Sequence, residues 1–209
     1  MTGFDALFHW IFAPYAQYAP WEIAIEATAV FFGIWSVVLA RKNHIGVYPT
    51  GIVSTGIYMY VTVSVGLYAD GFINLYYTLM SIYGWYAWTH VAQHEAERPI
   101  TQLTPRAWRW VLYAFIGLFM AFYTGLTEFT DSNVAWADAT TTSLAFIAMA
   151  LMARRHLEHW YFWLATNVIS IPLYLYKELA LTSFQFMVFT YLAYTGWRSW
   201  LMLIKPQPK

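Results

Sequence analysis

The chain has 209 residues, of which 60% are hydrophobic, 21% aromatic and only 11% charged, and its formal net charge is zero. Soluble domains carry about 25% charged residues, so this composition excludes a water-exposed globular surface and indicates a membrane protein. Zero net charge gives no sign of nucleic-acid binding, and a chain without cysteine has no disulfide, thiolate metal site or cysteine nucleophile.

Long hydrophobic segments predict an all-α, polytopic membrane protein. A helix needs roughly 20 apolar residues to cross a hydrocarbon core of about 30 Å, and these segments are too long and continuous for barrel strands. Residues 1–20 place apolar side chains at helical spacing and predict an amphipathic segment on the membrane surface. Seven transmembrane helices are then predicted, in chain order at 21–40, 49–68, 71–89, 108–126, 138–153, 160–176 and 179–201.

The chain contains an internal repeat. The phrase YGWYAW at 83–88 returns 112 residues later as TGWRSW at 195–200, and the same offset pairs Thr55 with Asn167. Residues 39–42 align with 152–155 after one residue of slippage. Two similar bundles in a membrane favour a transporter with a cavity between them, although a duplication that serves only packing is the alternative. We expect a first three-helix repeat at 21–90, a loop, linker helix and outer loop at 91–137, a second repeat at 138–201 and a tail at 202–209.

Lysine and arginine predict the orientation. Ten of them fall on one side of the predicted spans and only Lys177 on the other. The basic side is expected in the cytoplasm, which puts the N-terminus outside and the C-terminus inside. The single middle helix then makes the two repeats parallel, in a three-one-three arrangement.

The sixth span carries a candidate ligand site. Trp163 and Asn167 stand four residues apart on one helix face, and Ser170 and Tyr174 continue it. An amide in the middle of a span needs a partner, which is either another helix or a ligand. Because the first half has Gly51 and Thr55 at the equivalent positions, the ligand is favoured.

The third and seventh spans carry further polar and aromatic candidates. Asn74 and Tyr77 lie on one face of the third span, and Gln185 and Phe189 on one face of the seventh. If the two repeats face each other, these amides converge with Asn167 between aromatic walls. Tryptophans near the predicted span ends, among them 160 and 200, fit interfacial belts instead.

The remaining polar residues argue against other classes of protein. Glu22 and Glu26 either bind a proton or cation or lie among headgroups, and both interpretations stay open. No charged residue occupies the central turns of the spans, which favours a facilitator over a proton-coupled pump. Two histidine pairs lack a third ligand, and no zinc-protease, hydrolase or phosphate-loop motif occurs, so we expect no metal, no cofactor and no enzyme activity.

With WLATN at 163–167 after a basic loop and GWYAW at 84–88, the sequence resembles the PnuC family of bacterial nicotinamide riboside transporters over about residues 21–201. The resemblance implies the three-one-three fold, facilitated diffusion of nicotinamide riboside across the inner membrane and a homotrimer. It also implies an intracellular riboside kinase as a metabolic partner. The family's WxxxN pattern implies ligand-binding roles for Trp163 and Asn167, and the tryptophan-rich end of the third span adds Trp85 and Trp88.

The chemistry of the candidate site suits such a substrate. Nicotinamide riboside carries a pyridinium cation, a carboxamide and a ribose. Aromatic faces bind cations at roughly 0.5 to 2 kcal/mol each, and amides both donate and accept hydrogen bonds. A site without a basic residue is expected to reject the phosphorylated mononucleotide. Two alternatives stay open, a facilitator for a sugar or thiamine-like vitamin on the same fold and a membrane scaffold that transports nothing.

Overall fold

The computed structural model describes residues 19–64, 66–90, 98–130, 132–176 and 180–204. The surface segment predicted at 1–20 lies almost entirely outside these ranges, as do Lys177 and most of the predicted tail at 202–209. The described chain consists of helices and connecting turns, with one isolated bridge between Thr101 and His156. The all-α prediction is confirmed.

Seven helices occupy the described residues where the hydrophobic segments predict them. Their bounds are α2 Pro20–Arg41, α3 Val47–Ser64, α4 Tyr68–Thr89, α5 Pro105–Phe129, α6 Ala135–Ala153, α7 His159–Tyr176 and α8 Ala180–Leu203. Predicted and observed ends differ by at most four residues, and the largest difference is at the end of α3. That helix stops early because the chain turns at Gly66, whose φ of 82° is one that glycine readily adopts.

Prolines and a cap set several helix boundaries. Pro20 and Pro105 occupy the first helical positions of α2 and α5. A backbone N–H at this position has no partner within the helix, so proline loses no hydrogen bond there. The Thr104 side chain accepts a hydrogen bond from the Ala107 backbone N–H at 3.2 Å. Pro172 lies inside α7, where it removes one backbone hydrogen bond of the helix.

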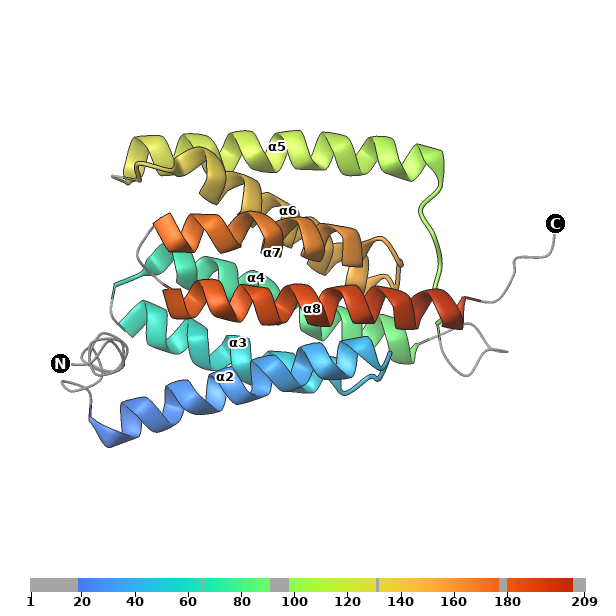
Figure 1. The fold of residues 1–209 in the computed structure, drawn as a ribbon, viewed down its shortest axis with the longest axis horizontal. Coiled ribbons are helices and arrows are strands. Elements are labelled where there is room, and N and C mark those ends of the chain that lie inside the picture. The colour runs from blue at the N-terminus through green and yellow to red at the C-terminus, as the bar shows by residue number, and fades with distance from the viewer. Residues whose placement is uncertain (1–18, 65, 91–97, 131, 177–179, 205–209) are drawn as a thin grey trace, which may run out of the picture.

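The helices have the dimensions of membrane spans. Among the described residues, α2, α5 and α6 are long and apolar enough to cross a membrane by length and composition. The other four are 18 to 24 residues long, and their hydroxyl, tyrosine and tryptophan side chains lower the mean hydropathy. All seven lie side by side along a common direction (Figure 1). Because 18 helical residues span about 27 Å, the bundle matches a bilayer.

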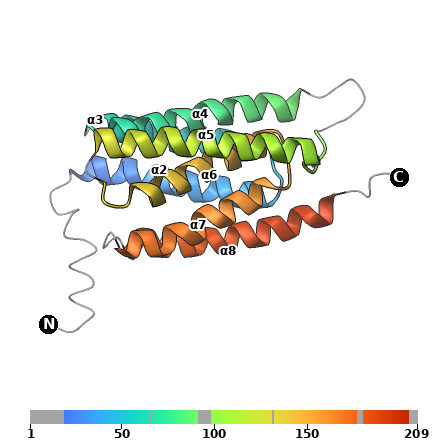
Figure 2. The same cartoon turned by 90° about the horizontal axis from the view of Figure 1, so that it is seen from above.

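The helices pack in a closed ring. α2 contacts α3 and α3 contacts α4, while α6 contacts α7 and α7 contacts α8. The two triplets meet where α4 contacts α6 and where α8 contacts α2. α5 packs against α6 outside the ring, and Figure 2 shows the same bundle from above. α2, α4, α6 and α8 run in one direction and α3, α5 and α7 in the other (Figure 1), so the triplets are parallel.

A constant offset of 112 residues relates the triplets. It converts the bounds of α3 into those of α7 and the start of α4 into the start of α8. It also holds in the turns that follow α2 and α6, where Asn43 and Arg155 both have positive φ, 53° and 61°. The backbone N–H groups of these two residues donate to Ala40 and Met152 respectively, each at 2.9 Å. The one-residue slippage expected from the sequence is therefore wrong for this turn.

The repeated Gly-Trp phrase marks the closest helix contact in each triplet. A Cβ atom on Gly84 of α4 would lie 2.3 Å from the Tyr48 ring of α3. A Cβ atom on Gly196 of α8 would lie 2.5 Å from the Trp160 ring of α7. Both glycines are therefore required by the close approach of the neighbouring aromatic ring.

The buried core lies at the end of the ring where α2, α4, α6 and α8 finish. Its largest buried side chains are Tyr48, Trp88, Trp160 and Trp200. The belt positions expected for Trp160 and Trp200 are wrong, because these residues are only 2% and 0% exposed. We call this the basic end, since it carries every described Lys and Arg, namely Arg41, Lys42, Arg98, Arg106, Arg109, Arg154, Arg155 and Arg198. The opposite, acidic end carries Glu22, Glu26, Asp70, Glu128 and Asp138.

Candidate functional site

An aromatic wall connects the two triplets. The ring centroid of Tyr77 in α4 lies 6.1 Å from that of Phe146 in α6 and 6.4 Å from that of Trp163 in α7. Beside it, Tyr76 stacks on Phe146 with centroids 3.9 Å apart and donates its hydroxyl proton to the Phe146 carbonyl oxygen at 2.8 Å. Helices of both triplets thus bring aromatic rings together, an arrangement that can bind a flat cation.

Phe146 is a member of this wall that the sequence reasoning misses. Its equivalent 112 residues earlier is Ile34. The comparison of the two halves that singles out Trp163 and Asn167 would also mark this difference. The signal is present in the sequence, but it is one of many differences between the halves.

Asn167 places a buried amide one turn along α7 from Trp163. The residue is 5% exposed, and no hydrogen bond joins its side chain to another described residue. Its amide atoms are not among the fully enclosed unpaired polar atoms of the described chain, so they keep some accessible surface and can bond to water or a ligand. The interhelical hydrogen bond that was the alternative for Asn167 is not formed within the described part of the chain.

The equivalent positions in the first triplet are satisfied internally. Thr55 of α3 and Thr78 of α4 share a hydrogen bond, with 2.7 Å between their Oγ1 atoms. Ser54 donates to the Ala29 carbonyl oxygen at 2.8 Å. Its counterpart Thr166 has a buried hydroxyl that finds no partner among the described residues. Ser54 and Thr55 therefore have partners within the first triplet, whereas their counterparts Thr166 and Asn167 have none among the described residues.

Aromatic contacts continue from Asn167 toward the acidic end. Ser170 is 2% exposed. One turn further, Tyr174 stacks on Phe186 of α8 with centroids 5.1 Å apart, and Phe186 meets Phe189 edge to face at 6.2 Å. Predicted residues of α4, α7 and α8 thus lie around one region of the bundle.

Other predicted residues have different surroundings. The Asn74 amide donates to the Asp70 carbonyl oxygen of its own helix at 2.9 Å. Gln185 is half-buried on α8. Trp88 lies in the core of the basic end, where its Nε1 donates to the Met152 carbonyl oxygen at 3.3 Å. Trp88 thus belongs to the buried cluster against which Tyr77 and Trp163 pack, and its indole N–H is already bonded within that cluster.

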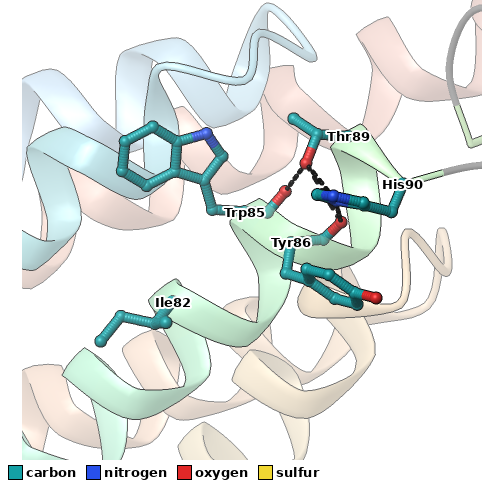
Figure 3. Close-up of a pocket in the computed structure, with 5 residues that line it drawn as sticks. All are labelled: Ile82, Trp85, Tyr86, Thr89 and His90. Atoms are coloured by element: carbon teal, nitrogen blue, oxygen red, sulfur yellow. Dashed lines mark hydrogen bonds between the residues drawn. The ribbon is translucent and has the colours of Figure 1, made fainter.

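Trp85 lines a shallow hollow on the surface of α4 (Figure 3). The hollow has a volume of about 260 Å³ and is lined by Ile82, Trp85, Tyr86, Thr89 and His90. The Tyr86 ring stacks on His90 at 4.1 Å, and the Thr89 hydroxyl lies 3.0 Å from His90 Nδ1. Because all five exposed residues belong to one helix and its C-cap, the hollow is a surface feature distinct from the aromatic wall.

The helix that carries Asn167 has no charged side chain. α3 and α7 contain no Asp, Glu, Lys or Arg. Glu22 has a structural role, since its Oε2 accepts the Ala19 backbone N–H at 2.8 Å at the start of α2. Within the described residues, no three or more histidine and acidic side chains are placed to hold a metal ion. The site therefore offers aromatic faces, amides and hydroxyls.

Comparison with known proteins identifies related sequences. The family model described as nicotinamide mononucleotide transporter matches residues 23–202. The nicotinamide riboside transporter PnuC of Escherichia coli K12 is 28% identical over 203 residues, which cover 85% of this chain and 84% of that protein. The protein of the same name in Neisseria mucosa is 28% identical over 156 residues, covering 72% and 59%.

A solved structure has a similar fold. The crystal structure of the vitamin B3 transporter PnuC aligns with a TM-score of 0.69 at 24% sequence identity, covering 98% of this chain and 93% of that one. At this identity the likeness shows a common fold alone. The relatives are named nicotinamide riboside transporters, whereas the family model is described as a nicotinamide mononucleotide transporter.

Proposed function

The chain belongs to the nicotinamide mononucleotide transporter family, and from that membership we propose that it carries nicotinamide riboside across the bacterial inner membrane. It is a multi-pass membrane transporter rather than an enzyme. The observation that carries the proposal is Asn167, a buried amide without a partner in the described chain, one turn from Trp163 of the aromatic wall.

The charge of the site favours the riboside over the mononucleotide. A phosphate in a low-dielectric site needs a cationic partner. α3 and α7 have no charged residue, and every described Lys and Arg lies at the basic end. The riboside has no phosphate, and its pyridinium cation can rest on aromatic faces at roughly 0.5 to 2 kcal/mol each.

We assign the site residues accordingly. Trp163 and Tyr77 face the pyridinium, and the Asn167 amide pairs with the carboxamide. Ser170, Tyr174, Gln185 and Phe189 surround the ribose, with Asn74 as a more distant polar group. Trp85 is left out of the proposed site because it lines the surface hollow of α4, and Trp88 because its indole N–H is already bonded to the Met152 carbonyl oxygen.

Transport is proposed to be uncoupled facilitated diffusion by rocking of the two triplets. With the basic end in the cytoplasm, the N-terminus is outside and the C-terminus inside. A cation moving inward gains about 2.3 kcal/mol per 100 mV of membrane potential, so no coupling ion is needed. An intracellular riboside kinase would trap the substrate, and the family resemblance supports a homotrimer.

Uptake into liposomes tests the proposal. The purified protein is reconstituted, and entry of radiolabelled nicotinamide riboside is measured against excess unlabelled riboside, mononucleotide and glucose. Saturable uptake that only the riboside blocks is expected. Block by the mononucleotide or by glucose would assign a different substrate, and absence of saturable uptake in folded, inserted protein would favour the scaffold interpretation.

A matched pair of variants tests the assignment of Asn167. Asn167→Leu removes the amide at similar volume, and we expect the half-saturation concentration for the riboside to rise about tenfold, since such a bond contributes roughly 1 to 2 kcal/mol. Thr55→Val changes the equivalent residue of the other triplet, which is bonded to Thr78. It is expected to leave the half-saturation concentration unchanged. Equal effects of the two substitutions would refute the assignment.

A further inference from the structure

Two equivalent residues touch at the basic end. Asn43 and Arg155 are separated by the repeat offset of 112 residues, and Arg155 Nε donates to Asn43 Oδ1 at 3.0 Å. A residue can contact its own counterpart only close to the axis that relates the two halves. In a transporter with parallel repeats, the substrate pathway runs between the halves along this axis. The Asn43–Arg155 contact therefore lies across the basic end of that pathway.

Arg155 joins several elements at this point. Its guanidinium also donates to the Arg98 carbonyl oxygen and lies 4.3 Å from the centroid of the Trp88 ring. The residue is only 2% exposed. One side chain of the second triplet thus holds the turn after α2 and the end of α4, both of which belong to the first triplet.

Reciprocal hydrogen bonds close the layer beneath this contact. Trp200 of the second triplet donates to the Ala40 carbonyl oxygen of the first at 2.8 Å. Its counterpart Trp88 donates in the opposite direction, to the Met152 carbonyl oxygen at 3.3 Å. The rings of Trp88 and Trp200 are 5.9 Å apart. The pathway is therefore shut at the basic end by contacts between the triplets.

The two turns at this end are supported unequally. The segment before α5 binds the turn between α6 and α7. The Thr101 N–H donates to the Arg155 carbonyl oxygen, and the Leu157 N–H donates to the Thr101 carbonyl oxygen. The Leu103 N–H donates to Glu158 Oε1. The Asn43 turn has hydrogen bonds within itself and to its two flanking helices. Among the described residues, the further hydrogen bond that holds this turn comes from Arg155. The turn between α6 and α7, which has the additional bonds, is thus the fixed side of the closure.

We propose that Arg155 is the gating residue of the cytoplasmic exit. It stays with the second triplet, whose turn is held by the Thr101 segment, and it releases the Asn43 turn and Trp88 when the pathway opens. This inference rests on the proposed transport function. Opening breaks the contacts of Arg155 with the first triplet and leaves the Thr101 segment in place. Arg155 acts through the equilibrium between closed and open states and makes no contact with substrate in the closed state.

The test measures how often the exit opens. The chain has no cysteine, so Ala40→Cys introduces a single thiol at a position that is 4% exposed in the closed exit. Its rate of reaction with a membrane-impermeant maleimide is measured in inside-out vesicles. Because hydrogen bonds of charged groups are among the strongest in proteins, Arg155→Gln is expected to raise this rate about tenfold. Asn43→Gly, which removes the amide and readily adopts the positive φ of this turn, is expected to raise it in the same direction.

Two controls separate gating from general loosening. Arg154→Gln removes the neighbouring, exposed arginine and is expected to leave the rate unchanged. Ala29→Cys, in the same helix, is 0% exposed and packs within the first triplet, where Ser54 bonds to its carbonyl oxygen. Its labelling is expected to stay low in the Arg155→Gln protein.

An unchanged Ala40→Cys rate in both Arg155→Gln and Asn43→Gly would overturn the proposal, as would an equal rise at Ala29→Cys. If Arg155→Gln does not fold, Asn43→Gly decides. Labelling needs no substrate, so a failure of riboside uptake and a failure of the gate are distinguishable.

Discussion

Replacing Gly84 by alanine tests the packing that joins α3 to α4. The added Cβ would lie 2.3, 2.5 and 2.8 Å from three atoms of the Tyr48 side chain. Tyr48 is 0% exposed, its hydroxyl donates to the Met152 carbonyl oxygen at 3.2 Å, and its ring meets Trp88 edge to face at 5.0 Å. The ring cannot withdraw without losing these contacts, so the substitution must displace a helix.

The expected loss of stability follows from two opposing terms. Overpacking a dense core costs about 1 to 3 kcal/mol, and alanine gains about 0.5 to 1 kcal/mol over glycine within a helix. The difference is roughly 0 to 2.5 kcal/mol, and we expect Gly84→Ala to lower the free energy of unfolding by about 1 kcal/mol. Gly56→Ala in α3 is the control, because a Cβ there meets nothing within 4 Å. Gly56→Ala is expected to raise the free energy of unfolding by about 0.5 to 1 kcal/mol, the gain of alanine over glycine within a helix.

Unfolding in detergent micelles, followed by tryptophan fluorescence, measures both variants. Gly84→Ala as stable as Gly56→Ala would refute the reasoning. A double substitution sharpens the result, since Gly84→Ala should cost less in a Tyr48→Leu background, where the ring is absent. Additive effects would show that the Tyr48 ring is not what excludes the Cβ atom.

Two further predictions concern the basic end. Trp88→Phe and Trp200→Phe each remove one hydrogen bond between the triplets, and each is expected to lower the free energy of unfolding by about 1 kcal/mol; unchanged denaturation midpoints would contradict this. Burial, followed by the charges of Arg98 and Arg154, lowers the pKa of His156 below 6.5. The folded state then binds this proton less readily than the unfolded state, so the contribution of His156 to stability is constant above about pH 6.5 and is lost as the pH falls below it. His156→Gln is expected to remove this part of the pH dependence in thermal unfolding, and an unaltered profile would argue against it.

Much of the fold could be predicted because its signals are local. Hydrophobic length located the seven helices, and the recurring Gly-Trp phrase revealed the repeat that the ring of α2–α4 and α6–α8 displays. The candidate site was predictable only in part. Trp163 and Asn167 stood out because the halves differ there, whereas Phe146 differs from Ile34 in the same way and was missed. The roles of the individual site residues stay predictions.

The tryptophans show why sequence alone was insufficient. Trp85 and Trp88 are three residues apart, yet Trp85 is 44% exposed on α4 and Trp88 is 3% exposed in the core. Trp160 and Trp200 lie near helix ends, where an interfacial position fits their sequence context equally well. The side that a helix turns to its neighbours, and not the distance from its end, determines burial.

Hydropathy and repetition are properties of the linear chain, so the order of residues alone indicates a helical membrane protein with two similar, parallel halves. Packing of the helices gives Thr55 a hydrogen-bond partner, whereas none of the described residues bonds the Asn167 side chain. Packing also brings Asn43 and Arg155 together between the halves. Both results depend on atoms brought together from distant parts of the chain, and such proximity is created only when the helices pack.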